Sequence, residues 1–477
     1  MNKMRTVKYA VLSCVFLNIL ACKTPVLTQK SENVNLPEAY PEAGLPAQNS
    51  GKLKWQEFFR DEHLQALIDT ALVNNQELNI MLREIEISKN EIQARKGEYL
   101  PFVNLRGGMG LDKGARYTSQ GALEEHAEMK PGKEIPDPMP DFMVGAFATW
   151  EVDIWHKLRN ATKSSVKRYL ATTEGKNFMV TNLVAEIANS YYELLALDKQ
   201  LEIINQYISI QNDALTVARL LKASTRSNEL AVKRFEAQLL KTGAMQYEVQ
   251  QKIVEAENRI NFLLGRYPQH VERSSGAFED LTPEIVHRGL PAELLQNRPD
   301  IRQAELELAA NKLDVLVAKA RFYPSLGLTA GVGLQAFNPV YLVKPQSILA
   351  NIAGEMVGPL INKRAITAEY NNANARQIQS VFDYERTILS AYIEVVNQVS
   401  KIKNLDSTYQ LKAQEMDALT KSITISNNLF KNARADYLEV LLTQREALET
   451  RFELVETKMQ QMTATVSLYK ALGGGWE

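Results

Sequence analysis

Cysteine is nearly absent from this chain, with only two residues among 477. Cys14 lies inside an N-terminal apolar run, and a mature chain that starts at Cys22 would hold no second thiol. A disulfide framework and a cysteine-based metal site are therefore excluded for that mature chain.

Motifs of catalysis are missing as well. The five histidines are scattered and show no HExxH or similar ligand spacing. The glycine pair Gly331 and Gly333 lies in a strand-like stretch, without the helix start that a dinucleotide site requires. Because the chain also lacks a serine elbow and a phosphate loop, we expect no enzyme, no catalytic residue, no metal site and no cofactor.

A basic footprint is also lacking. The formal net charge is -1, and 23% of the residues are charged. Nucleic acid is therefore not expected as a partner.

The N-terminus resembles a secretory signal. Three basic residues precede the apolar run at 9–20, which is too short for a membrane span. The run ends in Ile-Leu-Ala-Cys at 19–22, which resembles the lipobox of bacterial lipoproteins. We expect a signal peptide at 1–21, a covalent lipid such as palmitate on Cys22 and an anchored linker at 22–60. The alternative is a cysteine that happens to end a signal peptide.

The residue after this cysteine bears on location. Such lipoproteins usually need an aspartate there to stay in the inner membrane, whereas this chain has Lys23. The cell outer membrane is therefore the expected location.

Proline is missing from two long stretches, residues 142–267 and 360–477. Both are rich in Ala, Leu, Glu, Gln and Lys, which predicts helix. From Val180 to Ala218, residues spaced alternately by three and four form a seam that includes Gln211. This 3.5-residue period predicts left-handed coiled coil. A helix over 157–222 would be roughly 100 Å long, so it cannot pack into a compact globule.

The chain repeats itself. Residues 74–110 align with 297–333 without a gap, and RSNELAV at 226–232 matches RADYLEV at 434–440. Each half has the plan helix, strand, loop, strand, long helix, turn, long helix, which indicates duplication of a whole unit. The predicted divisions are a first repeat, a linker, a second repeat and a tail, at 61–265, 266–290, 291–472 and 473–477.

Four segments alternate apolar and polar residues, as strands do. In SLGLTAGVGL the leucines point one way, while Thr329 and the glycines point the other. In AFATWEVDIW, Thr149, Glu151 and Asp153 share one face. These four polar residues are candidates for lining a pore. The strands are expected at about 102–111, 143–154, 325–334 and 348–357.

The meaning of the strands stays open at this point. A soluble antiparallel sheet would show the same alternation, whereas an outer membrane location favours a closed barrel. Four strands cannot close a barrel, so spanning would require two or three chains. Arg106 breaks the alternation, which leaves the register of the first strand uncertain.

Several stretches resemble the TolC-like outer membrane efflux protein family, most closely its lipoprotein branch. They are WQEFFRDEHLQALIDTALVNNQEL at 55–78, ATWEVDIWHKLR at 148–159, NRPDIRQAELELAANKLDVLVAKARFYPSLGLTAG at 297–331 and GPLINKR at 358–364. The resemblance implies a mostly α fold with a small β part, in which a homotrimer forms a twelve-stranded barrel continued by a helical periplasmic tunnel. It also implies an exit duct for drugs and toxic compounds, contributing to antibiotic resistance. The implied partners are a periplasmic adaptor, an inner-membrane transporter of the resistance-nodulation-division type and outer membrane lipids.

The same resemblance implies that the two turns between the long helices, near 222–228 and 431–437 and called the helical turns, close the duct at rest. The candidates at the two turns are Arg226, Asn228, Arg434, Asp436 and Tyr437. Asp436 would form an acidic ring, with Arg434 and Tyr437 as latch partners. Alternatively, Asp436 only caps the helix that follows.

The motif Arg298-Pro299-Asp300 is explained structurally, with Asn297 as helix N-cap. The competing function is a lipid-anchored periplasmic coiled-coil scaffold without a pore.

Overall fold

The computed structural model describes residues 24–40, 49–274, 278, 281–282, 286–432 and 434–476. The predicted signal peptide and Cys22 lie outside the described residues. The described residues form two compact units: the first lies within 1–31, 86–170 and 306–382, and the second within 32–85, 171–305 and 383–477. Each unit therefore takes segments from both sequence repeats.

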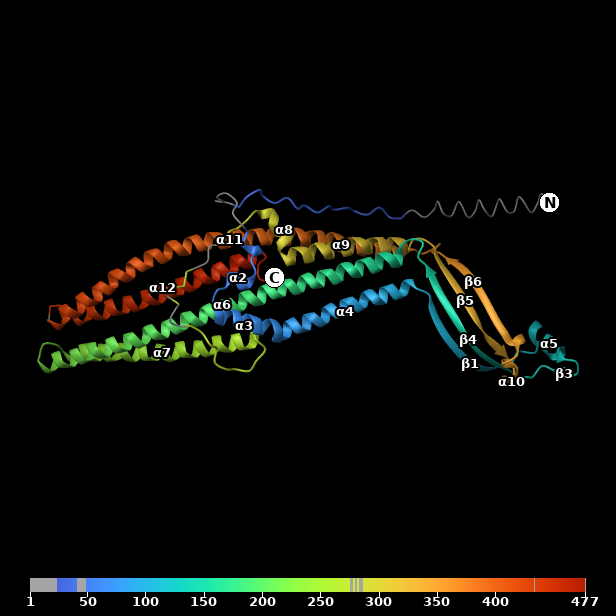
Figure 1. Cartoon of the computed structure of the whole chain (residues 1–477), viewed down its shortest axis with the longest axis horizontal. Coiled ribbons are helices and arrows are strands. Elements are labelled where there is room, and N and C mark those ends of the chain that lie inside the picture. The colour runs from blue at the N-terminus through green and yellow to red at the C-terminus, as the bar shows by residue number, and fades with distance from the viewer. Residues whose placement is uncertain are drawn as a thin grey trace. The chain divides into compact units, whose positions relative to one another are not determined.

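The order of elements repeats as the sequence predicts (Figure 1). The longest helices match in length, with 67 residues in α6 and 68 in α11, and the helices after them have 35 residues each. The first copy comprises α3 (Glu62–Asn74), α4 (Gln76–Tyr99), β1 (Phe102–Asp112), β4 (Met139–Val152), α6 (Lys157–Ala223) and α7 (Glu229–Leu263). The second comprises α8 (Leu294–Asn297), α9 (Pro299–Ala320), β5 (Ser325–Ala336), β6 (Ile348–Val357), α11 (Arg364–Lys431) and α12 (Tyr437–Ala471).

Short elements fill the connections. They are η1 (Ser50–Lys52), α2 (Trp55–Phe58), α5 (Ser119–His126), β2 (Glu128–Lys130), β3 (Lys133–Glu134), η3 (Pro291–Glu293), α10 (Pro339–Leu342) and η4 (Pro345–Ser347). The mostly helical fold with a small strand part is thus confirmed.

Proline marks where helix gives way to strand. Pro101 separates α4 from β1, and Pro324 separates α9 from β5. Since proline lacks a backbone donor and biases the preceding residue against helix, it ends each helix at this point. Pro299 instead begins α9, where its missing donor costs nothing.

The first unit contains a four-stranded antiparallel sheet with the order β1-β4-β5-β6. The predicted fourth strand has the observed bounds, and the second extends over 139–152 rather than 143–154. β4 pairs with β5 from Phe142–Ala336 to Val152–Leu326, so the two hairpins form one continuous sheet.

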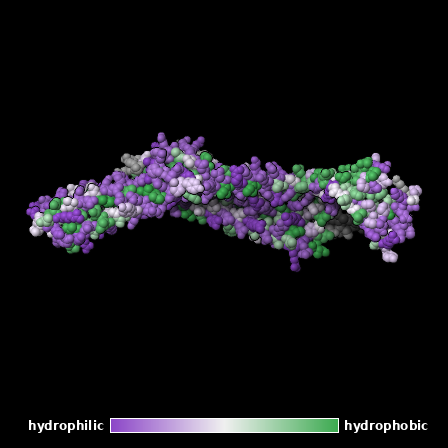
Figure 2. All heavy atoms as spheres, turned by 90° about the horizontal axis from the view of Figure 1, so that it is seen from below, coloured by the Kyte–Doolittle hydropathy of each residue, from purple (hydrophilic) through white to green (hydrophobic). Residues whose placement is uncertain are grey.

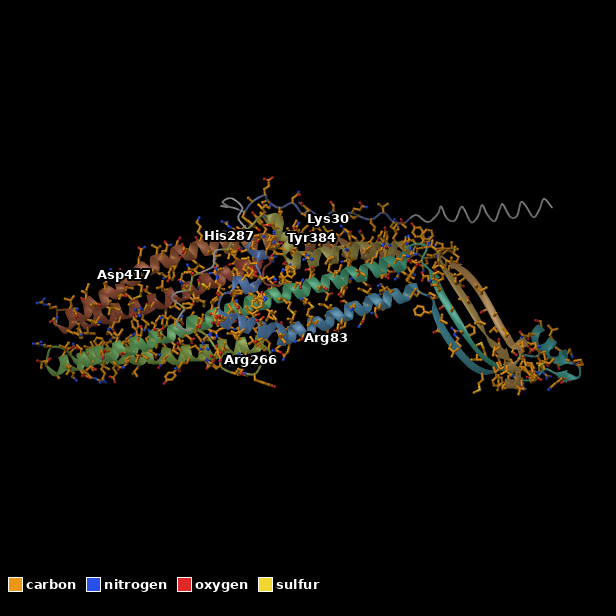
Figure 3. The ribbon with its side chains drawn as sticks, viewed as in Figure 1. Lys30, Arg83, Arg266, His287, Tyr384 and Asp417 are labelled. Carbon is orange, nitrogen blue, oxygen red and sulfur yellow. The ribbon has the colours of Figure 1, made fainter. Side chains whose placement is uncertain are left out.

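An extended segment that includes Thr28 and Lys30 lies against α11 within this unit. The amide of Asn374 donates to the carbonyl oxygen of Thr28 at 3.1 Å. The ammonium of Lys30, labelled in Figure 3, lies 4.4 Å from the ring centre of Phe382. These contacts fix the segment beside the helix.

The second unit holds the main apolar core. Phe58 stacks on Tyr469 at 4.0 Å between ring centres, and the core continues between the long helices through residues such as Tyr191. On the outside of this unit, Asp417 on α11, labelled in Figure 3, pairs with Lys421 at 2.6 Å. Within the described ranges, none of the helices combines the length and apolar character needed to cross a bilayer.

Candidate functional site

The sheet has two chemically different faces. Residues opposite one another in the antiparallel register share a face. One face, called the apolar face, has only apolar residues, glycine and proline: Val103, Leu105, Gly107, Met109 and Leu111 of β1, Pro140, Phe142, Val144, Ala146, Ala148, Trp150 and Val152 of β4, Leu326, Leu328, Ala330, Val332, Leu334 and Ala336 of β5, and Ile348, Ala350, Ile352, Gly354 and Met356 of β6. The other, called the polar face, has every polar side chain of the four strands: Asn104, Arg106, Asp112, Asp141, Thr149, Glu151, Ser325, Thr329, Gln335, Asn351 and Glu355.

The apolar face is open in the single chain. Leu105 is 81% exposed and Ile352 is 84% exposed. In Figure 2, hydrophobic residues gather over the strands, and hydrophilic ones cover the adjoining loops. A large exposed apolar surface marks contact with a membrane or another protein.

Arg106 does not break the alternation, contrary to the expectation from sequence. It pairs with Gly145 and lies on the polar face, 5.3 Å from the ring centre of Phe147. The Phe147 ring covers Gly331, where an added Cβ would come within 2.7 Å of it. Glycine therefore provides the space for this aromatic side chain, and the arginine packs over it.

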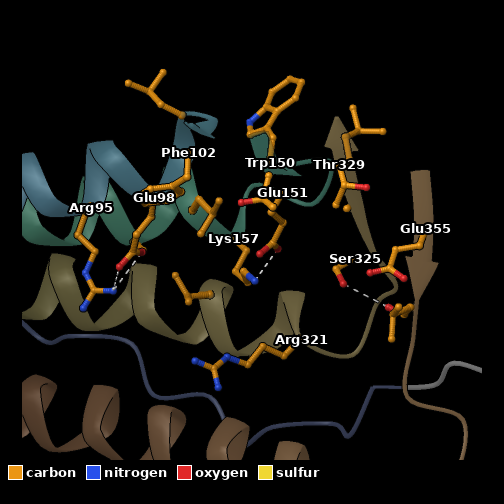
Figure 4. Close-up of a pocket in the computed structure, with 18 residues that line it drawn as sticks. Arg95, Glu98, Phe102, Trp150, Glu151, Lys157, Arg321, Ser325, Thr329 and Glu355 are labelled. Carbon is orange, nitrogen blue, oxygen red and sulfur yellow. Dashed lines mark hydrogen bonds and ion pairs between the residues drawn. The ribbon is translucent and has the colours of Figure 1, made fainter. Parts of the chain in front are cut away.

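A cavity of about 640 Å³ lies where the polar face meets the helices of the same unit (Figure 4). Three pore-lining candidates, Thr149, Glu151 and Thr329, lie in its wall. Thr149 and Thr329 are direct register partners, which explains why two distant sequence segments meet here.

The charges around this cavity are balanced. The carboxylate of Glu151 lies 2.5 Å from the ammonium of Lys157, and Glu98 pairs with Arg95 at 3.1 Å. Glu355, which sequence reasoning missed, faces the cavity beside its register partner Gly327. Its signal was available, because Glu355 is the only charged residue of the predicted fourth strand. The wall of this cavity therefore carries both signs of charge.

Asp153 does not line the cavity, so this prediction is corrected. Its side chain is buried, and its carboxylate accepts hydrogen bonds from the backbone N–H groups of Leu158 and Arg159 at 3.1 and 2.9 Å. It lies just beyond the end of β4 and caps the start of α6. Local alternation missed this role because the bonds involve residues of the following helix.

At the first helical turn, Asn228 caps α7 by accepting from the N–H of Ala231 at 3.0 Å. Arg226 is exposed, and its N–H donates to the carbonyl oxygen of Leu221 at 2.9 Å. Thr225 adopts the left-handed backbone (φ 60°) that glycine often takes at such turns. A hydrogen bond from Lys222 lowers the pKa of the Glu229 carboxyl.

The second turn repeats this geometry. The N–H of Arg434 donates to the carbonyl oxygen of Leu429 at 2.9 Å, and Asp436 caps α12 by accepting from the N–H of Leu438 at 3.4 Å. Asp436 and Arg434 are exposed, whereas Tyr437 packs against an apolar cluster. In the described part of the chain no ion pair joins Arg434 to Asp436. The proposed capping role of Asp436 is present, and its gating role stays a prediction.

Arg298 joins three helices in the second unit. Its guanidinium lies 2.8 Å from carboxylates of Asp300 and Glu394, and it donates to the carbonyl oxygen of Ala471 at 2.8 Å. Burial favours the neutral form, but the bonds to these carboxylates outweigh it and raise the pKa of Arg298. Asn297 is the last residue of α8 rather than the N-cap of α9, which corrects the sequence interpretation.

Among the residues placed by the structure, no three or more His, Cys, Asp and Glu side chains gather in a group that could hold a metal ion.

Comparison with protein families identifies one match. The model described as outer membrane efflux protein matches residues 67–266 and 290–474. Both sequence repeats are therefore covered.

Known proteins are similar along most of the chain. The cation efflux system protein CusC of Escherichia coli O6:H1 is 28% identical over 437 residues, covering 90% of this chain and 89% of the relative. The pyoverdine export outer membrane protein OpmQ of Pseudomonas aeruginosa is 26% identical, covering 89% and 88%. A crystal structure of CusC has the same fold, with a TM-score of 0.82 at 24% identity over 94% of this chain and 100% of that one.

Proposed function

Because the chain belongs to the outer membrane efflux protein family and is an efflux protein of the outer membrane, we propose that three copies form one passive exit duct. Each copy supplies four strands, so three supply the twelve of one closed barrel. The single observation that carries the proposal is the sheet itself. All its polar side chains lie on one face, and the opposite apolar face is exposed.

The membrane explains both faces. Hydrocarbon offers no hydrogen-bond partners, so strands that span it must pair along every edge. β1 and β6 are the edge strands of the sheet, each with one neighbour. Pairing of β1 with β6 of the next copy would leave no edge. The apolar face would contact lipid, and the polar face, with Thr149, Glu151 and Thr329, would line the lumen.

Exposed apolar residues on the helices support assembly of copies. On α7, Leu240, Tyr247 and Val254 recur every seven residues and are exposed. On α11, Leu389 and Leu411 are exposed as well. Such stripes are what helices present to neighbouring helices in oligomers.

The test combines assembly with conduction. A variant with one cysteine on β1 and one on β6 should form disulfides between copies, and denaturing gels should then show a ladder up to the trimer. The same purified protein should open stable pores in a planar bilayer. The competing scaffold without a pore predicts neither result, and protein that stays monomeric and opens no pore would overturn the duct.

We further propose a tripartite pump, in which a periplasmic adaptor couples the duct to an inner-membrane transporter of the resistance-nodulation-division type. The named relatives concern cations and pyoverdine, two chemically different cargoes. The balanced charges of the cavity support a duct of low selectivity, so drugs and toxic compounds are the proposed cargo and the transporter would choose among them.

Cys22 is proposed as the lipid anchor, on the lipobox-like Ile-Leu-Ala-Cys sequence. Cells fed labelled palmitate should label the wild-type protein and not the Cys22→Ser variant. Equal labelling of both would rule out an anchor at Cys22, without bearing on the pore.

A further inference from the structure

Two glutamines of the second unit are buried without partners. Gln211 of α6 is 1% exposed and Gln444 of α12 is 0% exposed. In the described chain, neither the nitrogen nor the oxygen of either amide has a hydrogen-bond partner. A buried amide that no protein group satisfies makes this packing less stable than an apolar one of the same shape.

Both glutamines lie where the apolar core is interrupted. A main core cluster includes Tyr207 of α6 and Ala447 of α12. A separate cluster near the helical turns, called the tip cluster, comprises Ala214, Leu215, Ala218, Val232, Phe235, Phe430 and Val440. Gln211 lies between the two clusters along α6, and Gln444 lies between them along α12.

The other two helices have a buried polar residue in the same interval. Thr242 of α7 is 0% exposed and lies between Phe235 and Val249, which belong to different clusters. Ser426 of α11 lies between Met416 and Phe430 and is also buried. The four residues Gln211, Thr242, Ser426 and Gln444 are called the polar layer.

Only the glutamines of this layer are unsatisfied. The hydroxyl of Thr242 donates to the carbonyl oxygen of Gln238 at 3.1 Å, and that of Ser426 to the carbonyl oxygen of Ile423 at 3.2 Å. On the side of the layer away from the helical turns, Arg451 of α12 donates to the side chain of Gln206 of α6 at 3.2 Å. The layer is thus a break across all four helices, with two amides that water would stabilise.

We propose that the polar layer marks how far along the bundle the hairpin of α6 and α7 separates from the hairpin of α11 and α12 when the duct opens. The separation would start at the helical turns and end at the layer. This inference rests on the proposed duct with closing turns. Phe235 of α7 and Phe430 of α11 lie 5.8 Å apart between ring centres, and the proposed opening separates this pair. The polar layer confines that separation to the tip cluster, because apolar contacts do not continue across it. Water reaches the amides of Gln211 and Gln444 once the tips part, which favours the open state.

The test replaces both amides by an apolar side chain of similar size. In the full-length trimer, Gln211→Met with Gln444→Met removes the buried unpaired groups and should lower the frequency of pore openings in a planar bilayer by about tenfold. Gln250→Met, at an exposed position of α7, is the matched control and should open as the wild type does. A double variant that is more heat-stable yet opens as often as the wild type would reduce the layer to a packing defect.

Failure of the duct itself has a different outcome. If the wild-type trimer never conducts, the proposed function is wrong. The polar layer is then tested by backbone amide hydrogen exchange instead. In wild-type protein, residues 208–215 and 440–447 should exchange at least about tenfold faster than residues 187–197 of the main core. Equal protection of all three segments would overturn the polar layer as a line of opening, whether or not the double variant assembles.

Discussion

At the scale of single residues, Asp436 combines an observed role with a predicted one. It caps α12, and its carboxylate is exposed at the turn. Asparagine caps a helix about as well as aspartate does, so Asp436→Asn keeps the cap and removes the charge. If a ring of carboxylates closes the duct, this variant should raise pore conductance in a planar bilayer as much as Asp436→Ala.

The chain contains a matched control at its other turn. Asn228→Ala removes the corresponding cap of α7 without changing charge, and should lower helix stability by about 1 kcal/mol. If the charge of Asp436 closes the duct, conductance stays the same in this variant, and Asn228 is then removed from the gate candidates. Wild-type conductance in Asp436→Asn would leave this residue with the capping role alone.

Loss of Arg298 should strongly weaken the second unit. Arg298→Met leaves the carboxylates of Asp300 and Glu394 without their buried cation, and breaking such a pair costs roughly 3–5 kcal/mol. We expect a clear fall in the temperature at which the purified protein unfolds. Arg386→Met, which removes an exposed pair with Asp383, should change stability by no more than about 0.5 kcal/mol. Equal stability of both variants would show that Arg298 is not a joint between helices.

The sequence predicted which face of a strand a side chain occupies better than it predicted the hydrogen-bond partners of that side chain. The alternation of the second strand correctly grouped Thr149 with Glu151, since side-chain direction depends only on position along a strand. It wrongly added Asp153, because the burial of that carboxylate depends on where α6 begins. Asn297 was assigned to the wrong helix end for a similar reason: α8 and α9 meet there, and sequence alone did not reveal the short helix before Pro299.

At the scale of elements, the two faces of β1 make opposite predictions for neighbouring positions. Leu105 lies on the apolar face and Asn104 on the polar face. Lysine on a lipid-facing strand position costs up to about 2–4 kcal/mol near the bilayer midplane. Leu105→Lys should therefore reduce the amount of heat-resistant trimer in outer membrane fractions, whereas Asn104→Lys should leave it close to the wild-type level. The reverse result would mean that the polar face contacts lipid.

The bounds of the first and third strands were predicted to within two residues, whereas the register of the first strand was not. The glycine and leucine alternation at 325–334 predicted β5 within two residues of its end. For β1, Arg106 obscured the pattern, because its place over Phe147 depends on a neighbouring strand. The seam of α6 likewise included Gln211, but only the packed helices reveal that its amide has no partner.

At the scale of the whole chain, duplication and compactness divide the protein differently. The repeats follow one another in sequence, whereas each compact unit is built from both. Sequence periodicity reports the first division, because duplication copies local patterns. The second arises because the strands and the helical turns of each repeat come together with their counterparts. Equivalent residues of the two repeats therefore lie in the same compact unit, where one binding partner can contact both.

The helical turns offer such equivalent positions to the proposed adaptor. Leu230 and Leu438 occupy matching places in the repeated segments and are both exposed, at 55% and 53%. Exposed leucines that add nothing to the fold gain most from burial against a partner. Leu230→Asp with Leu438→Asp should abolish copurification with the adaptor while the trimer remains, since exposed substitutions change stability by only about 0.5 kcal/mol. Tyr117→Asp, in the loop between β1 and β4, is the matched exposed control and should keep the adaptor bound. Retention of the adaptor by the double variant would place its binding surface away from these turns.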